Sequence, residues 1–400
     1  MTAVHRTIST RGATDPRFRL PEPLSLYLDI IRLGAAGLVF LSHVGSRAIS
    51  GGFLWRFGDL GPVALVIFFV LSGYVVAFAS DRRDYTAHDY IVARLSRMYS
   101  VALPAIILSV LLYEFIGDQL PRGYDPDWHG WTLSLHITMS MLFLNEAWGA
   151  WLVPPLDGPF WSLSYEMAFY IMFGIWRFAP HPWRIAGILL VAAVFGPRIT
   201  ALFPMWLLGV ACYHASKTQR LRPGFGWMLT TLTAAGIVCL GILSWDKGIF
   251  QADRGIATHS PMEIAEDYLL ACLFGSHIVG FTRVASGFSW ITKFGRPIRW
   301  AAGGTFSLYL FHYPILIAML SLLPWPVESW MFRATLVLGT LGIVFALAEL
   351  TERRRLLWRQ MFDFLIGLIS VRAGWLNQGV GTPPLPSAYS SPRVKPPGQA

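Results

Sequence analysis

The chain has 400 residues, of which 54% are hydrophobic and 14% are charged, and its mean hydropathy is +0.50. These values exclude a typical soluble domain and a disordered chain, since both carry more charged and polar residues. The net charge of +9 would suit a nucleic-acid-binding protein. The positions of the basic residues show that this charge reflects membrane topology instead. We therefore expect anionic lipid as a partner and no nucleic acid.

The apolar residues gather into runs that are long enough to cross a bilayer, which takes roughly 20 residues at about 1.5 Å rise per residue. We therefore predict an all-α, polytopic membrane protein with about ten transmembrane helices. The predicted spans are residues 24–45, 60–80, 98–116, 159–178, 184–197, 199–214, 226–245, 264–282, 303–323 and 329–350.

The chain divides into four regions. A basic tail (1–20) that we expect to be disordered precedes the transmembrane domain (24–350). A basic amphipathic segment (351–372) follows, which we expect to lie along the cytoplasmic interface. The final region (373–400) is rich in Pro, Gly and Ser and is predicted to be disordered.

Basic residues alternate between the two sides of this ten-span map. The two tails and the loops on their side hold 24 of the 32 Lys and Arg residues, whereas the opposite loops hold six. Lys and Arg accumulate in cytoplasmic loops. The sequence therefore predicts that both termini are cytoplasmic.

Two ionisable residues of the first span lie on one helical face. An Arg in the centre of a membrane helix costs roughly 2.5–3.5 kcal/mol, so its presence needs a reason. Arg32 and His43 are eleven residues apart, which is about three turns and about 16 Å along the axis. A cation near the cytoplasm and a titratable base deeper in the span suit an elongated anionic ligand that enters from the cytoplasm. Alternatively, both residues pair with neighbouring helices.

A second basic feature lies where the third span begins. Arg94 and Arg97 are three residues apart and so share a helical face. Guanidinium groups bind phosphate in a bidentate manner, which favours a phosphate site. The alternative is ordinary enrichment of basic residues on the cytoplasmic side.

One carboxylate lies in the fourth span at a depth comparable to His43. Glu166 ends the segment Gly158 to Glu166, about 10 Å below the outer surface. A carboxylate can orient an imidazole and stabilise its protonated form, so Glu166 is a candidate partner of His43. It could instead only bridge helices. The ten His residues include no HExxH motif or close pair, so we expect no metal site.

Five blocks of the sequence resemble the membrane-bound acyltransferase-3 family of bacterial O-acyltransferases. They stand in the family's order and together span about residues 24–350. The blocks are Leu28 to Arg32 with Ser42 and His43, Phe68 to Tyr74, Arg94 to Arg97, Phe160 to Glu166 with Phe169 and Tyr170, and Ser307 to Pro314. Two departures are Ile30, where the family has Gly, and Val44 with Gly45 after the histidine.

The resemblance implies a multi-pass enzyme of the bacterial inner membrane. It would take an acyl group, most often acetyl, from cytoplasmic acyl-CoA and deliver it to a hydroxyl of a glycan or a lipid-linked saccharide. His43 matches the family's essential histidine and would act as general base, with Glu166 orienting it. The residues that match CoA-side positions are Arg32, Arg94 and Arg97. Further candidates for substrate binding in these blocks are Trp161, Ser162, Tyr309 and His312.

Two other classes of protein share these features. A transporter of a lipid-linked saccharide or of a small polar substrate would also have about ten helices and buried charges. A scaffold without catalytic activity would need only the fold.

The topology is testable by cysteine labelling. Single cysteines introduced at positions 220 and 125 should react with an impermeant reagent from the inside and the outside, respectively, because basic residues flank the first loop and acidic residues the second. Labelling of both positions from one side would contradict the ten-span map.

Overall fold

The computed structural model describes residues 20–121, 130–218, 222–247 and 261–373. These residues form helices joined by loops and contain no strand. The α-helices are α1 (Glu22–Val44), α2 (Arg47–Ser50), α3 (Gly61–Arg82), α4 (Ala87–Ile116), α5 (Trp131–Met141), α6 (Leu163–Phe178), α7 (His181–Phe195), α8 (Pro197–Thr218), α9 (Pro223–Lys247), α10 (Pro261–Val284), α11 (Gly295–Ala302), α12 (Thr305–Leu322), α13 (Trp330–Ala334), α14 (Thr340–Leu350) and α15 (Arg355–Ala373). The predicted tails lie outside the described residues, apart from one residue at each junction.

The predicted all-α membrane fold is confirmed. Eight helical segments of the described chain are long and apolar enough to cross a membrane. The fourth and fifth predicted spans fall on α6 and α7, which are short for a span, with 16 and 15 residues. A 3-10 helix, Gly158–Ser162, precedes α6 directly and lengthens it. Helix α5 was not predicted.

Helix α4 begins eleven residues before the predicted third span, and its cap explains why. The Thr86 side chain accepts a hydrogen bond from the Asp89 backbone N–H at 3.1 Å, as an N-cap residue does. This cap extends the helix into the basic segment before the apolar run. Arg94 and Arg97 therefore sit on a continuous helix, which fixes the direction of both side chains.

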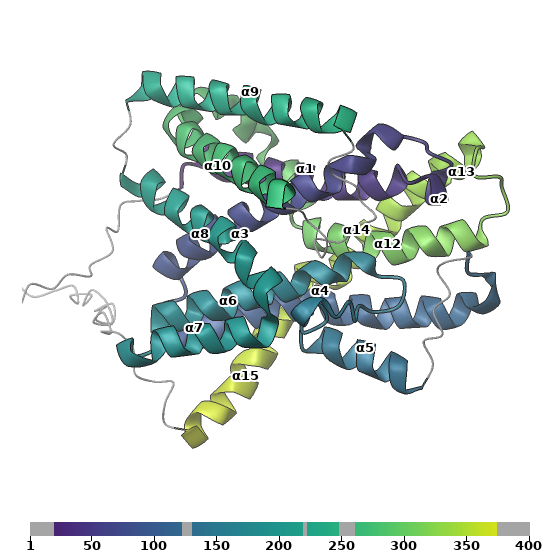
Figure 1. Ribbon diagram of the computed structural model, residues 1–400, viewed down its shortest axis with the longest axis horizontal. Coiled ribbons are helices and arrows are strands. Elements are labelled where there is room, and N and C mark those ends of the chain that lie inside the picture. Colours follow the sequence, from purple (N-terminus) through teal and green to yellow (C-terminus); the bar gives the residue numbers. More distant parts are fainter. Residues whose placement is uncertain (1–19, 122–129, 219–221, 248–260, 374–400) are drawn as a thin grey trace, which may run out of the picture.

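Helix α1 lies in the upper half of the bundle in the view of Figure 1. It packs against α3, α11 and α12. Its buried face includes Leu28, Ala36 and Phe40. Arg32 and His43 are thereby held against α3 and α12 rather than facing lipid.

Helices α3 and α8 approach each other closely because each has a glycine at the contact. A Cβ atom at Gly73 would lie 2.0 Å from the Trp206 carbonyl oxygen, and one at Gly209 would lie 2.0 Å from the Val70 carbonyl oxygen. Backbone atoms cannot move aside as a flexible side chain can. Only glycine allows this spacing, which sets the position of Ser72, the neighbour of Gly73.

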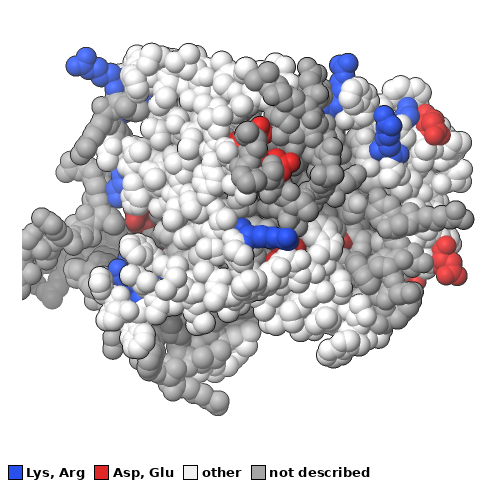
Figure 2. Space-filling model, viewed as in Figure 1, with Lys and Arg blue, Asp and Glu red and all other residues white. Residues whose placement is uncertain are grey.

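Apolar side chains cover most of the outer surface, as a bilayer requires. In the view of Figure 2 the charged side chains are few and uncharged atoms dominate. Large apolar side chains on the outward faces of the helices are exposed, among them Phe115, Leu190, Leu232 and Leu338. Lipid chains would cover these side chains in the membrane.

The close α3–α8 contact is testable with paired glycine substitutions. Gly73→Ala should destabilise the protein by about 1–3 kcal/mol, because the added methyl group overlaps the Trp206 carbonyl. Gly37→Ala is the matched control, since a Cβ atom at this position of α1 meets nothing within 4 Å. The melting temperature of each purified variant in detergent measures the difference. Equal melting temperatures would contradict the proposed contact.

Candidate active site

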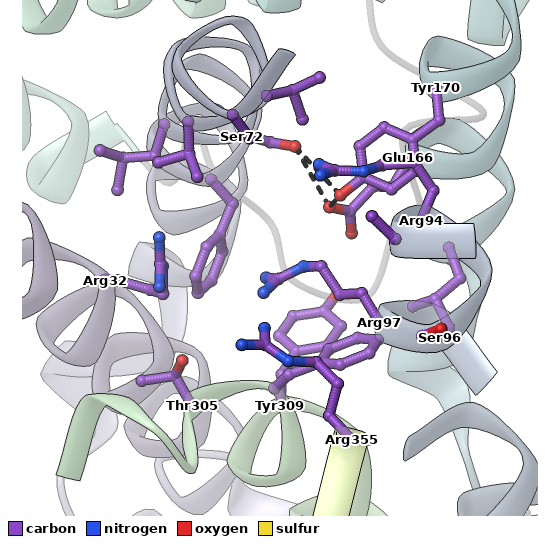
Figure 3. A pocket seen from close by; sticks show the side chains of 18 of the residues that line it. Arg32, Ser72, Arg94, Ser96, Arg97, Glu166, Tyr170, Thr305, Tyr309 and Arg355 are labelled. Carbon is purple, nitrogen blue, oxygen red and sulfur yellow. Dashed lines mark hydrogen bonds between the residues drawn. The ribbon is translucent and has the colours of Figure 1, made fainter. Parts of the chain in front are cut away.

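A cavity of about 240 Å³ lies between α1, α3, α4, α6, α12 and α15. Figure 3 shows its wall, with Arg32 on one side and Arg97 facing it from another. Six of the nine site residues predicted from the sequence line this cavity: Arg32, Arg94, Arg97, Ser162, Glu166 and Tyr309. They come from four helices and the 3-10 turn before α6.

The predicted arginines differ in how they are held. Arg94 is 11% exposed and forms an ion pair with Asp84 at 2.9 Å. Its guanidinium carbon also lies 5.5 Å from the centre of the Tyr170 ring, within range of a cation–π contact. Arg32 has a longer contact, 3.8 Å, with Asp29 one turn earlier. The Arg97 guanidinium lies over the Phe306 ring at 5.7 Å and has no carboxylate within 4 Å among the described residues.

Glu166 lies inside the cavity but is not paired with His43. Its carboxylate accepts a hydrogen bond from Ser72 at 3.2 Å and another from Tyr170, one turn further along α6. The prediction that Glu166 partners His43 is therefore not met in this structure. Its side chain points instead toward α3 and the Tyr170 hydroxyl.

A hydrogen bond between α12 and the turn before α6 lies at another part of the wall. The hydroxyls of Ser162 and Tyr309 are 2.8 Å apart, and both side chains are buried. Tyr309 also donates to the Pro159 carbonyl at 3.2 Å. These bonds fix two of the predicted substrate-binding side chains on the cavity wall.

His43 and His312 form a pair next to the cavity rather than on its wall. Their ring centres are 5.2 Å apart, and the Tyr313 ring lies 4.7 Å from His43. His312 is one turn beyond Tyr309 on α12, so the pair adjoins the Ser162–Tyr309 contact. His312 Nδ1 lies 2.7 Å from the Leu308 carbonyl, which can only accept, so this nitrogen carries the proton. The fully buried Nε2 then holds a free lone pair, for which the described residues provide no hydrogen-bond partner.

A comparison with protein families decides the identity of the fold. The acyltransferase domain of the acyltransferase-3 family matches residues 25–349. The chain belongs to this family. The match extends from α1 to α14 and includes every site residue predicted from the sequence. The protein is therefore a multi-pass membrane acyltransferase.

Three curated relatives are similar to this acyltransferase. The O-acetyl transferase of Shigella phage Sf6 is 22% identical over 72% of this chain and 83% of the relative. Acyltransferase MdmB of Streptomyces mycarofaciens is 28% identical over 46% of this chain and 48% of its own length. Exopolysaccharide production protein ExoZ of Rhizobium meliloti is 28% identical over 36% of this chain and 43% of its own length. No solved structure matches the chain.

Other parts of the acyltransferase depart from the sequence-based site. Trp161 does not line the cavity; it is buried against the Tyr165 ring, at 5.2 Å between ring centres. Three further arginines that sequence reasoning did not assign to the site do line it: Arg83, Arg355 and Arg359. The four-residue spacing of the last two was a visible signal, because it places both on one face of a helix. Among the described residues no cluster of His, Cys, Asp and Glu is arranged to hold a metal ion.

Proposed function

We propose that the protein is an O-acyltransferase of the bacterial inner membrane that moves an acyl group, most simply acetyl, from cytoplasmic acyl-CoA to a hydroxyl of a glycan or lipid-linked saccharide. One observation carries the proposal: an arginine-lined cavity adjoins a pair of histidines, of which His312 is buried and His43 is partly buried. The cavity suits the anionic part of the donor, and the histidine pair suits the proton transfer that acylation of a hydroxyl requires.

The donor end is supported by the character of the arginines. Arg32, Arg94 and Arg97 face one space from α1 and α4. A guanidinium fork matches the oxygens of a phosphate group and keeps its charge at any physiological pH. The ring surface of Phe306 holds Arg97 without neutralising it, whereas Arg94, which lies over the Tyr170 ring, is also paired with Asp84. In this proposal both termini and the arginine end of the cavity face the cytoplasm, where acyl-CoA is made.

The chemical step is assigned to the histidine pair. His43 takes the proton from the acceptor hydroxyl as the oxygen attacks the thioester carbonyl. The C–S bond then breaks, and the thiolate of CoA leaves toward the arginine cavity. The free Nε2 of His312 is placed to accept a hydrogen bond from the acceptor hydroxyl or from His43. Its role is therefore to bind and orient rather than to take the proton first.

The path between the two ends passes Ser162 and Tyr309. Both hydroxyls line the cavity, whereas His43 and His312 do not. The pantetheine arm of the donor has to reach past this hydrogen-bonded pair to bring the thioester to His43. Glu166 stays on the donor side, where its carboxylate lies among the arginines and accepts from Ser72 and Tyr170.

The acceptor class is supported by the relatives. One of them is named an O-acetyl transferase and another an exopolysaccharide production protein. A saccharide also presents the hydroxyl groups that the histidine chemistry needs. We therefore assign the acceptor to the glycan class, in free or lipid-linked form.

The base assignment predicts that binding and chemistry can be separated. His43→Ala should lower the transfer rate by about 10²- to 10⁴-fold, because general-base catalysis contributes about that factor. The folded yield and the affinity for acetyl-CoA should stay near those of the unmodified protein. Turnover, melting temperature and donor affinity should be measured on one detergent-solubilised preparation.

A second histidine provides the control for this experiment. His214 is exposed on α8 and does not line the cavity, so His214→Ala should leave all three measurements unchanged. A folded His43→Ala protein that retains full turnover would rule out His43 as the base. A loss of folded yield with normal activity per folded molecule would assign His43 a packing role instead.

A further inference from the structure

Helix α15 contributes to the cavity although it lies beyond the family domain. The match to the acyltransferase family ends at residue 349, and α15 begins at Arg355. The helix packs along α4, which carries Arg94 and Arg97, and then leaves the bundle obliquely (Figure 1). Its first turns place Arg355, Leu356 and Arg359 on the cavity wall.

The cavity carries more positive than negative charge. Six arginines line it, namely Arg32, Arg83, Arg94, Arg97, Arg355 and Arg359, against two carboxylates, Asp84 and Glu166. Burial raises the pKa of Asp84, although the Arg94 charge opposes this shift. For Arg83, Arg97, Arg355 and Arg359 the structure has no carboxylate within 4 Å among the described residues. The side chains that line the cavity carry an excess of about four positive charges, and the nearby Glu352, which interacts electrostatically with Arg32, Arg97 and Arg355, offsets part of it.

The arrangement of these groups indicates one shared ligand. Figure 3 shows the Arg97 and Arg355 side chains next to each other, both pointing into the cavity and toward Arg32. Like charges that converge in a partly dry space repel each other, so an anion between them would stabilise the arrangement. Arg359 is one turn beyond Arg355 on α15 and shares its face. The α15 arginines are exposed, so they stand where the cavity opens to solvent.

We propose that Arg355 and Arg359 bind the phosphates at the nucleotide end of the acyl donor, so that α15 completes the donor site from outside the family domain. This inference rests on the proposed function. The diphosphate and the 3′-phosphate of acyl-CoA together carry about four negative charges, enough to balance the positive excess of the cavity. Because α15 lies at the open end of the cavity, its arginines contact the nucleotide. The thioester lies deeper in the cavity, toward Ser162 and Tyr309.

Phosphate could reach these arginines from a second source, the headgroups of anionic lipids. Arg359 is exposed on α15, and basic amphipathic helices bind such membranes. The two sources differ in their dependence on lipid composition and on donor structure. A donor site depends on the 3′-phosphate and not on the lipid.

The test compares donors of decreasing charge on matched variants. Arg355→Gln, Arg359→Gln and the double variant are purified in nanodiscs of phosphatidylcholine alone or with phosphatidylglycerol. Arg354→Gln is the control, because this neighbouring arginine is exposed and does not line the cavity. Equilibrium binding is measured with acetyl-CoA, acetyl-dephospho-CoA and S-acetylpantetheine. Monodispersity and melting temperature show which variants are folded.

The double variant should bind acetyl-CoA at least roughly tenfold more weakly, because hydrogen bonds to charged groups contribute about that factor each. Its affinity for S-acetylpantetheine should not change, and both lipid compositions should give the same result. Arg355→Lys, which keeps the charge but loses the fork, should lose less than Arg355→Gln.

Several results would overturn the inference. One is an acetyl-CoA affinity that is the same in the double variant and in the Arg354→Gln control. Another is a loss of S-acetylpantetheine affinity as large as the loss of acetyl-CoA affinity. A loss of acetyl-CoA affinity that occurs only in anionic nanodiscs would assign the arginines to lipid binding. If the unmodified protein binds acetyl-CoA in none of these conditions, the proposed donor itself is wrong. Wild-type binding thus separates failure of the proposed function from failure of the α15 assignment.

Discussion

Burying cationic side chains in an apolar bundle costs free energy, and the arrangement of the site depends on the groups that offset this cost. Arg94 has a carboxylate partner at 2.9 Å, and Arg32 has a weaker contact at 3.8 Å. The other arginines of the cavity are held by aromatic faces or stand at its open end. In the proposed function, the phosphates of the acyl donor balance the positive charge of the cavity.

The helices around the cavity fix the positions of the arginines relative to the histidine pair. The Thr86 cap places two arginines on α4, and the glycine contact between α3 and α8 places Ser72 against Glu166. Helix α12 carries Tyr309 toward the cavity and His312 one turn further on. A single helix, α1, links the two ends, since Arg32 lines the cavity and His43 lies beside His312. In the proposed function, donor recognition and proton transfer thus take place at separate points of the bundle.

The parts of the fold that depend on local composition could be predicted from the sequence. Apolar runs identify the spans, and the eleven-residue spacing of Arg32 and His43 places them on one face of α1. Arg94 and Arg97 reach the same cavity as Arg32, as a shared ligand would require. Helix α5 was missed because its 11 residues are too few to cross a bilayer.

The errors concern contacts between distant segments. Depth alone suggested that Glu166 meets His43, but depth does not say which way a side chain points around its helix, and Glu166 faces Ser72 instead. Trp161 packs against Tyr165 and does not line the cavity, and its role in substrate binding stays a prediction. The contribution of α15 depends on how it packs against α4, and nothing in its own sequence specifies that neighbour. The roles of the site residues stay predictions.

The most direct test of transfer from acyl-CoA to a hydroxyl is a mass balance in proteoliposomes. Acetyl-CoA labelled in the acetyl group is supplied with a saccharide acceptor, and free CoA and acetyl ester are counted together. The account predicts one molecule of free CoA for each acetyl ester formed, and neither product without the acceptor. Movement of saccharide across the bilayer with no CoA release and no ester would contradict it and identify a transporter.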